Sequence, residues 1–470
     1  MPAPGDLLEA LEREASYSLS IWRRLTAPQL FVGSFLGLIA LGTLALFLLP
    51  GIYTGPRLSF IDAFFMATSA VCVTGLIVVD TATYFTPFGQ AVILALIQLG
   101  GLGILTFTTV IILWLGGRLT LRGEAVLAGA ERGPQLEPAR LVRAILRYTF
   151  IIEAAGAIGL WLVWMRELGP IGALWPAMFH AISAFCNAGF STFSDNLVGF
   201  AAQPAALTVI MSLVVLGGIG FLVLSELLSW VRVPRRRRLS LHTRFVLLAT
   251  GVLIVAGAIL FAAFEWTNTL TRFPWYVRPF EALFLSITPR TAGYATVDYG
   301  QLTSASVFLT MLLMLIGGSP GSTAGGLKTT TVAVLVALAV ARFRGRIVTS
   351  AFRRTVPEMT IQRSIGLVVV VVALLGATLL LLQVTELGGV PLPLAEGRFL
   401  KIAFEAVSAF GTVGLSIGIT PLLSPFGKLV LSALMFLGRV GPLTFAASMI
   451  VAARKPHVSF RYAAEDVIIG

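Results

Sequence analysis

Charged residues are scarce in this chain. They make up 12% of its 470 residues, while apolar residues make up 57%, and soluble domains carry about 25% charged residues. With a mean hydropathy of +0.91, the composition excludes an ordinary soluble domain and indicates an integral membrane protein.

Cysteine and histidine are also rare, with 2 and 3 residues. Cys72 and Cys186 occupy equivalent places in a repeated motif, which argues against a disulfide between them, and the scattered histidines give no metal-ligand spacing. No nucleophile and base stand in a catalytic arrangement, so an enzyme is not expected. The polar segment before the first apolar run has no signal-peptide pattern, and we expect that run to begin on the cytoplasmic side.

The chain is rich instead in one short motif, which occurs four times. Each copy is a run of small or hydroxyl residues that ends in a glycine, at Gly75, Gly189, Gly293 and Gly414. Each copy follows an apolar stretch that is too short to cross a bilayer as a helix. We predict four half-helices, at 61–72, 175–186, 279–288 and 399–410.

Longer apolar runs flank each half-helix, so every unit reads as span, half-helix, glycine motif and span. The predicted fold class is an all-α polytopic membrane protein, with eight transmembrane helices in four pseudo-symmetric repeats around one central pore. The spans are predicted near 29–50, 88–116, 142–165, 205–231, 244–264, 304–342, 364–385 and 425–452. The predicted division is an N-terminal segment (1–28), four repeats (29–116, 142–231, 244–342 and 364–452), three linkers (117–141, 232–243 and 343–363) and a C-terminal tail (453–470).

The basic residues indicate the orientation of these spans. A net charge of +12 would suggest nucleic acid as the partner of a soluble protein, but here the arginines gather in blocks between apolar runs, so no nucleic acid is expected. The basic blocks lie at 23–24, 118–143, 232–238, 342–354 and 454–455. By the positive-inside rule these blocks are cytoplasmic, which places both termini and all three linkers in the cytoplasm. Attraction to anionic membrane lipid is a secondary expectation.

The four glycine motifs are expected to surround one aqueous path, because backbone polar groups cannot stay unsatisfied in hydrocarbon. Carbonyl oxygens can replace the hydration shell of a monovalent cation, and glycine permits the dihedral angles that turn successive carbonyls toward one axis. Half-helices would help by directing their negative C-terminal ends at the cation. The predicted potassium-binding residues are Val73, Thr74, Gly75, Asn187, Ala188, Gly189, Thr291, Ala292, Gly293, Thr412, Val413 and Gly414. No other metal site is expected.

Three carboxylates follow the glycine motifs at similar distances. Asp80, Asp195 and Asp298 come five or six residues after the glycines of repeats 1, 2 and 3, and repeat 4 has Thr420 instead. At an outer vestibule they would raise the local cation concentration. The alternative interpretation is ordinary solvation of a loop.

Paired glycines recur in the second spans at one depth. In repeats 1 and 2 we interpret them as packing glycines that let helices approach closely. The third span contains five glycines and a proline, so we expect it to break into two pieces joined by a functional loop inside the membrane. This loop comprises Gly317, Gly318, Ser319, Pro320, Gly321, Ser322, Thr323, Ala324, Gly325 and Gly326, followed by Lys328. A phosphate-binding loop is not favoured, because Leu327 interrupts the motif and no strand precedes it.

Two arginines lie within the predicted membrane region. Arg439 in the fourth repeat is level with the loop of the third, and a guanidinium inside a span usually faces a cavity or a partner. The hypothesis is that Arg439 projects toward the pore, hydrogen-bonds carbonyls of the loop and opposes cation passage; the alternative is a structural brace. Arg290 is expected to point away from the axis, toward Glu281 or Glu405.

These motifs resemble those of the Ktr/Trk/HKT superfamily of potassium transporters, in particular the bacterial Ktr-type membrane subunit. The resemblance rests on residues 69–76, 185–190, 288–293 and 408–414, on the loop with Lys328, and on Gly438 with Arg439. It implies a potassium-channel-like chain in the bacterial cytoplasmic membrane, in which the loop at 317–326 is the gate. It also implies a homodimer on a cytoplasmic ring of nucleotide-binding (RCK-type) regulator subunits, with no covalent cofactor and with Na⁺ as activator in sodium-dependent members.

The family pattern leads to two expectations, one on the choice between K⁺ and Na⁺ and one on the alignment of the third half-helix. Serine in place of the first filter glycine goes with sodium permeation in the plant branch, so glycine at all four positions favours K⁺. Ser286 is one residue out of register with Ser69, Ser183 and Ser408. We therefore expect the third half-helix to be shifted.

One alternative from another class is a cation-coupled secondary transporter of an organic solute. Such carriers place ionisable residues at mid-membrane on broken helices. Glu153 and Glu226 are the acidic candidates, and both are expected near span ends. A receptor or scaffold would not require four matched glycine motifs.

Overall fold

A computed structural model describes residues 27–103, 138–232, 239–395 and 397–450 of the chain. Predictions that concern the N-terminal segment, the end of the span at 88–116, most of the first linker, residues 233–238 and the C-terminal tail lie outside these described residues. Helices dominate the described part. Its only sheet is a two-stranded hairpin of β1 (Ser350–Ala351) and β2 (Arg354–Thr355).

Four half-helices occur where the sequence predicts them: α3 (Phe60–Val71), α9 (Leu174–Cys186), α13 (Arg278–Ile287) and α17 (Arg398–Gly411). Each follows a long apolar helix of the same unit. These four first helices are α2 (Ala27–Leu48), α8 (Pro138–Leu168), α12 (Leu241–Glu265) and α16 (Glu358–Leu387). All four are long and apolar enough to cross a membrane.

The second helices of the units are shorter and begin with strong signals. They are α5 (Pro87–Leu102), α10 (Pro204–Ile219), α14 (Ser304–Leu315) and α18 (Pro425–Val440). Proline at the first helical position is pre-organised for a helix and loses no hydrogen bond there. In α5 and α18 a hydroxyl before that proline, on Thr86 and Ser424, also accepts from the third backbone N–H.

Continuous second spans were predicted for units 2 and 4, and this prediction is wrong. In unit 2, α10 gives way to α11 (Phe221–Arg232) with a bend of 103°, and in unit 4, α18 gives way to α19 (Pro442–Ile450). Gly220 (φ 93°) and Gly441 (φ 87°) form the breaks, in a region that glycine enters without the cost of a side chain. The predicted break in unit 3 is present, because α14 is followed by the loop and then by α15 (Thr329–Phe343).

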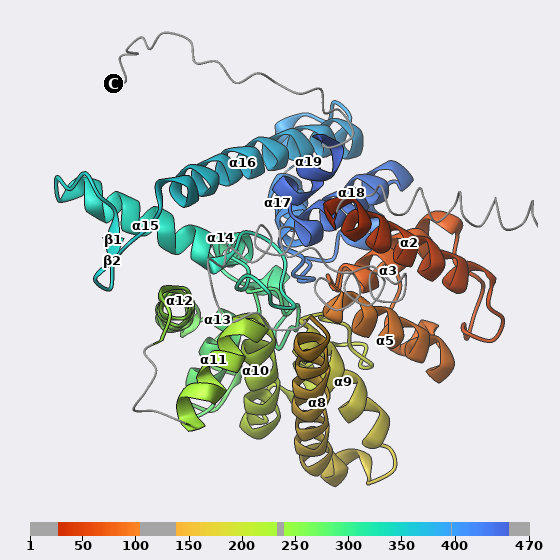
Figure 1. The fold of residues 1–470 in the computed structure, drawn as a ribbon. Coiled ribbons are helices and arrows are strands. Elements are labelled where there is room, and N and C mark those ends of the chain that lie inside the picture. The colour runs from red at the N-terminus through yellow and green to blue at the C-terminus, as the bar shows by residue number, and fades with distance from the viewer. Residues whose placement is uncertain (1–26, 104–137, 233–238, 396, 451–470) are drawn as a thin grey trace, which may run out of the picture.

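The four units close into a ring. The second helix of each unit packs on the half-helix of the next: α5 on α9, α10 on α13, α14 on α17, and α18 back on α3. Figure 1 shows the four groups around a common centre, from the red and orange unit 1 to the blue unit 4. This closure brings the four glycine motifs together at the centre.

In three units a carboxylate joins the end of the first helix to the start of the second helix. Glu167, Glu265 and Glu386 each lie at the end of a first helix and accept hydrogen bonds from residues at the start of the second helix of the same unit. In units 3 and 4 the donors include the backbone N–H of Thr303 (2.9 Å) and of Ser424 (3.0 Å). These bonds hold the two helices at a fixed separation around the half-helix.

The short elements connect these helices. They are α4 (Thr81–Tyr84) and the 3₁₀ turns Val198–Phe200, Thr269–Arg272, Tyr299–Gln301, Leu392–Ala395 and Thr420–Leu422.

Candidate ion-conducting site

The glycine motifs, here called the filter segments (residues 72–75, 186–189, 290–293 and 411–414), share one backbone conformation. The residue two places before each glycine has a positive φ: Val73 (56°), Asn187 (60°), Thr291 (75°) and Thr412 (51°). The φ of each filter glycine is positive too: Gly75 (91°), Gly189 (69°), Gly293 (74°) and Gly414 (91°). The residue between them has no positive φ, so left-handed and ordinary residues alternate. Such alternation turns successive peptide groups to one side.

Four side chains in this left-handed region are not glycine, which is an uncommon and costly arrangement. Valine and threonine are β-branched, and positive φ is a genuine outlier for such residues. Strain of this kind persists only where the surroundings fix the conformation, and it clusters at functional sites.

A hydroxyl from the preceding half-helix fixes each filter segment. In units 1 and 4 the hydroxyls of Ser69 and Ser408 accept from the backbone N–H of the filter glycine, at 3.1 Å in both cases. In unit 2 the Ser183 hydroxyl donates to the carbonyl of Phe190 (2.9 Å), and in unit 3 Thr288 donates to that of Tyr294 (2.6 Å). The corresponding hydroxyl in unit 3 therefore belongs to Thr288, one residue nearer to its glycine than in the other units.

Ser286, which the sequence places out of register, does not contact the filter segment. Its hydroxyl donates to the carbonyls of Leu253 and Ile254 on α12, at 3.3 and 2.8 Å. The half-helix α13 ends at Ile287, six residues before its glycine, whereas the other half-helices end three or four residues before theirs. Thr288 takes over the bracing role.

The four glycines contact one another in a cycle. A methyl group at Gly75 would come within 2.3 Å of the carbonyl oxygen of Ala188, and one at Gly189 within 2.9 Å of that of Ala292. A methyl group at Gly293 would come within 2.3 Å of the oxygen of Val413, and one at Gly414 within 2.1 Å of that of Thr74. Each unit thus meets the next and the fourth meets the first. Only glycine fits at this approach of four backbones.

The half-helices end at these segments. Their last residues are Val71, Cys186, Ile287 and Gly411. The negative ends of four helix dipoles are therefore close to the filter segments, which favours a cation there.

Several oxygens beside the ring are buried without a hydrogen-bond partner among the described residues: Thr74 Oγ1, Asn187 Oδ1, Thr291 Oγ1 and Thr412 Oγ1. Three of them belong to the residue two places before a filter glycine, in units 2, 3 and 4. A buried unpaired oxygen is costly unless water or an ion satisfies it. Neutral oxygens of this kind are able to coordinate an alkali cation without a charged ligand.

The loop at 317–326 lies directly against the filter segments. A methyl group at Gly325 would meet the Thr412 hydroxyl at 2.2 Å, and one at Gly317 the Thr291 methyl at 3.3 Å. The Asn187 amide donates to the Thr323 hydroxyl at 2.8 Å. The loop therefore touches side chains from three of the four filter segments.

Backbone bonds fix the loop to neighbouring units. The N–H groups of Ser319 and Thr323 donate to the carbonyls of Gly218 (2.9 Å) and Gly217 (3.2 Å) in unit 2, and that of Gly326 donates to Gly438 (3.3 Å) in unit 4. The first glycine of the pairs in units 1 and 2, and the equivalent Gly438 in unit 4, also lie close to a half-helix carbonyl. A methyl group at Gly100, Gly217 or Gly438 would come within 2.0, 2.0 or 1.9 Å of one. These contacts agree with the interpretation of the paired glycines as packing positions.

Arg439 is 2% exposed and joins the loop to unit 1. Its Nη1 donates to the carbonyl of Thr323 and its Nη2 to that of Gly100 at 2.7 Å, while Nε has no partner among the described residues. The expected bond to a loop carbonyl is thus present. Lys328 adds a second cation, and its Nζ donates to the carbonyl of Ala324 at 2.7 Å.

The prediction that Arg290 points toward Glu281 or Glu405 is wrong. Its guanidinium lies 3.5 Å from the hydroxyl of Thr250 on α12, which directs it away from the ring. Glu281 instead accepts from Thr296 (2.6 Å), and Glu405 accepts from Ser416 and Thr420. These hydroxyls bond both oxygens of Glu405 and the Oε2 of Glu281, while the Oε1 of Glu281 has no partner among the described residues.

The three predicted vestibule carboxylates all cap local turns. Asp80 accepts from the N–H of Ala82 (3.0 Å), Asp195 from Gly199 (2.8 Å) and Asp298 from Gly300 (2.9 Å). Asp80 also accepts from the hydroxyl of Ser194, across the boundary between units 1 and 2 (2.7 Å). Asp195 and Asp298 remain exposed to solvent.

Sequence reasoning misplaced one buried carboxyl. Glu153 is not near a span end but at the centre of α8, and it is 4% exposed. It accepts from the Gln98 amide of unit 1 (3.1 Å) and lies 4.0 Å from the Cys186 thiol. Glu226 caps α12 through Ser240 and Thr243, as a residue near a helix end would.

Comparison with known proteins identifies the class. The model of the TrkH family, described as cation transport protein, matches residues 29–459. The chain is 38% identical to potassium/sodium uptake protein NtpJ of Enterococcus hirae, over 95% of this chain and 98% of that protein. It is 37% identical to Ktr system potassium uptake protein B of Bacillus subtilis, over 96% and 98%. In structure it resembles the potassium transporter TrkH from Vibrio parahaemolyticus, with a TM-score of 0.71 and 19% identity over 92% and 86% of the two chains.

The ring of helices with the four filter segments at its centre thus belongs to an integral membrane protein that transports cations. More narrowly, the chain is a member of the TrkH family of cation transport proteins and a homologue of Ktr-type potassium uptake proteins.

Proposed function

We propose that this chain takes up K⁺ through a pore formed by its four filter segments. The observation that carries the proposal is the cycle of glycines, in which each backbone approaches the carbonyl that precedes the glycine of the next unit. Carbonyls in such a ring replace the hydration shell of a monovalent cation without a charged ligand. The relatives named as potassium or potassium/sodium uptake proteins support this cargo.

In the proposed arrangement, each unit contributes one filter segment and two membrane crossings, so that eight spans surround one pore. The basic blocks face the cytoplasm, which places both termini there. Carboxylates of Asp80, Asp195 and Asp298 gather cations on the outer side while they cap their turns.

The loop at 317–326 is proposed as the gate. It lies against the filter segments of units 2, 3 and 4, and two cationic side chains, Arg439 and Lys328, hold it there. An unpaired positive charge beside a cation path opposes passage. Opening requires the loop to leave its bonds with Gly217, Gly218 and Gly438.

Cytoplasmic partners are part of the proposal. The name of the Bacillus subtilis relative describes a Ktr system, which supports assembly of this chain with a further subunit. We propose a homodimer seated on a ring of nucleotide-binding regulators of the RCK type, and Na⁺ as an activator.

A cation-coupled carrier remains the second candidate, because Glu153 is buried at the centre of a span. Carriers of this kind use ionisable groups at mid-membrane to bind the coupling ion. The Glu153→Gln variant separates the two candidates. A pore keeps its Rb⁺ flux in that variant, whereas a carrier loses coupled transport.

The direct test is ⁸⁶Rb⁺ uptake into proteoliposomes, with K⁺, Na⁺, Li⁺ and Cs⁺ as competitors. The proposal predicts that K⁺ and Rb⁺ compete strongly and that Li⁺ competes weakly. Equal competition by all four cations would contradict a carbonyl-lined potassium site.

A further inference from the structure

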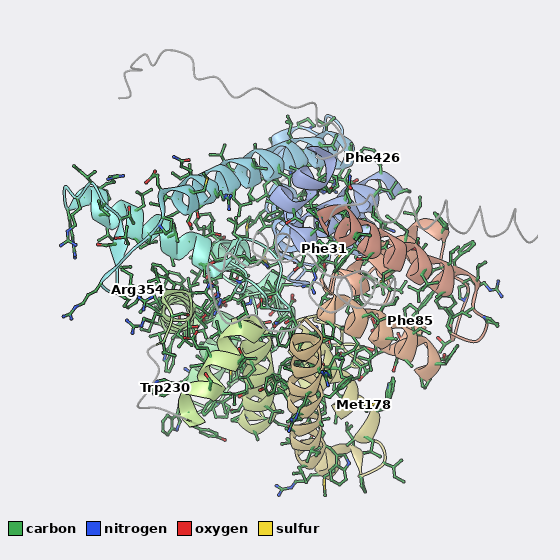
Figure 2. All side chains as sticks on the ribbon, viewed as in Figure 1. Phe31, Phe85, Met178, Trp230, Arg354 and Phe426 are labelled. Carbon is green, nitrogen blue, oxygen red and sulfur yellow. The ribbon has the colours of Figure 1, made fainter. Side chains whose placement is uncertain are left out.

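A basic segment projects from the ring next to the loop. We call residues 342–354 the basic tip: it comprises the end of α15, the turn that follows and most of the hairpin. Figure 1 shows α15 and the hairpin reaching away from the centre, and Figure 2 shows Arg354 pointing outward at its edge.

The charge of the basic tip has one sign. It contains Arg342, Arg344, Arg346, Arg353 and Arg354, and no aspartate or glutamate occurs from residue 329 to residue 357. All five arginines are exposed. Arg342 shapes the turn by donating to the carbonyls of Arg346 (2.9 Å) and Ile347 (2.6 Å). In the part of the chain that the structure describes, the other four guanidinium groups have no carboxylate partner.

Large apolar side chains alternate with these arginines and are also exposed. Phe343 is 93% exposed, Ile347 88% and Val348 56%. Phe352 differs from these three, because its ring packs on that of Phe245, with 5.9 Å between the ring centroids. Basic and apolar side chains exposed together are typical of segments that lie in a membrane interface.

The length of α15 places the basic tip at that interface. The helix starts at the loop beside the filter segments, which lie at membrane depth in the proposed arrangement, and 15 residues of helix rise about 22 Å. Half of the hydrocarbon core is about 15 Å thick. Even with a tilt of about 45° the end of α15 reaches the boundary between acyl chains and headgroups.

We propose that the basic tip binds anionic phospholipid headgroups of the leaflet that we assign to the cytoplasmic side. Arginine forks bind phosphate oxygens in pairs, while Phe343 and Ile347 enter the acyl boundary. This inference uses the proposed orientation but not the potassium selectivity of the pore. It deepens the gating proposal, because α15 begins directly after Lys328, so that lipid at one end of the helix positions the loop at the other.

The test is a depth measurement on the full chain in nanodiscs. An environment-sensitive fluorophore is attached to the Ile347→Cys variant; both native cysteines are fully buried, so the label is selective. Quenching by brominated phosphatidylglycerol is compared with quenching by brominated phosphatidylcholine. We expect at least about threefold stronger quenching by the anionic lipid.

A charge-matched pair of variants controls for electrostatics in general. Arg344→Gln/Arg346→Gln should abolish the preference for phosphatidylglycerol, while Arg143→Gln/Arg147→Gln, on the exposed face of α8, should preserve it. Thermal stabilisation by phosphatidylglycerol should follow the same pattern, and inorganic phosphate should not replace the lipid. Equal quenching by both lipids, or a label shielded only when a cytoplasmic protein is added, would overturn the proposal. Rb⁺ selectivity measured on the same variants tests the pore separately and should not change.

Discussion

At the scale of single residues, the filter glycines are the positions that tolerate substitution least. Gly75 and Gly189 combine positive φ with a carbonyl of the next unit at 2.3 and 2.9 Å from where a Cβ would lie. Any side chain there must push the ring apart. In the proposed pore, a wider ring would hold dehydrated K⁺ less well and would select K⁺ less strongly over Na⁺.

The first prediction follows from that geometry. Gly75→Ser and Gly189→Ser should each lower the permeability ratio of K⁺ to Na⁺ by at least about tenfold, which corresponds to about 1.4 kcal/mol. The measurement is competition in ⁸⁶Rb⁺ uptake. Gly251→Ser is the matched control, since no atom lies within 4 Å of a Cβ at that position on α12. Unchanged ratios in both filter variants would show that these segments do not select the ion.

Arg439 gives the second prediction. Arg439→Ala removes the bonds to the carbonyls of Thr323 and Gly100 and should raise Rb⁺ flux several-fold. The Arg439→Lys variant keeps the positive charge but cannot make both hydrogen bonds. Its flux should stay low if the charge itself blocks the path. Its flux should rise as in the alanine variant if the bonds to Thr323 and Gly100 keep the pore closed. A fall in flux by folded alanine protein would argue against any role in closing the pore.

At the scale of elements, the loop at 317–326 departs most from a regular helix. Besides bonds within its own unit, such as that from the Gly317 N–H to the Leu327 carbonyl (2.9 Å), its backbone donates to carbonyls of units 2 and 4. Thr323 is central to them, because its hydroxyl accepts from Asn187 and contacts the carbonyls of Phe185 and Gly217, each at 3.1 Å. An element held by a few such polar contacts can move as one piece.

The third prediction concerns this element. Thr323→Val should free the loop and raise Rb⁺ flux, and deletion of residues 319–324 should raise it further. Thr310→Val is the control, because that buried hydroxyl bonds only to Ser306 within α14. If folded deletion protein takes up less Rb⁺ than the wild type, the loop supports the pore instead of closing it.

The fourth prediction concerns the carboxylates that join the first and second helices of a unit. Glu265 accepts from Thr303 and Thr269 and should be worth about 1–3 kcal/mol of stability, because its removal leaves several donors unpaired. Glu265→Ala should lower the midpoint of thermal unfolding in detergent, and the exposed Glu358→Ala should not. Equal midpoints would show that the carboxylate does not hold α12 to α14.

At the scale of the whole molecule, the sequence predicted the pattern of half-helices because glycine and length alone define them. The four motifs and the deficit of charge were sufficient to predict their positions to within about two residues. The breaks in the second spans were harder. A single glycine also occurs inside ordinary helices, so Gly220 and Gly441 gave no clear signal of a break. In the structure the break at Gly220 lies against the loop of unit 3, whose Gly321 carbonyl accepts from the N–H of Phe221 (3.1 Å).

Contacts between units were the least predictable part. The aligned repeats suggested Glu281 or Glu405 as the partner of Arg290, but its guanidinium lies beside the Thr250 hydroxyl. The two carboxylates accept from hydroxyls of Thr296, Ser416 and Thr420 instead. The bond from Thr288 could have been found, since Thr288 is the first hydroxyl residue after Ser286 and lies only one residue from the position that Ser69, Ser183 and Ser408 occupy in the other units. Glu153 and Gln98 belong to different units, and no local pattern relates them.

One measurement tests the central claim most directly: anomalous diffraction from crystals of this protein soaked in Rb⁺. The account predicts an anomalous peak on the axis of the ring, within about 3 Å of the carbonyl oxygens of Thr74, Ala188, Ala292 and Val413. Peaks that lie only at the outer carboxylates, with none inside the ring at saturating Rb⁺, would contradict it.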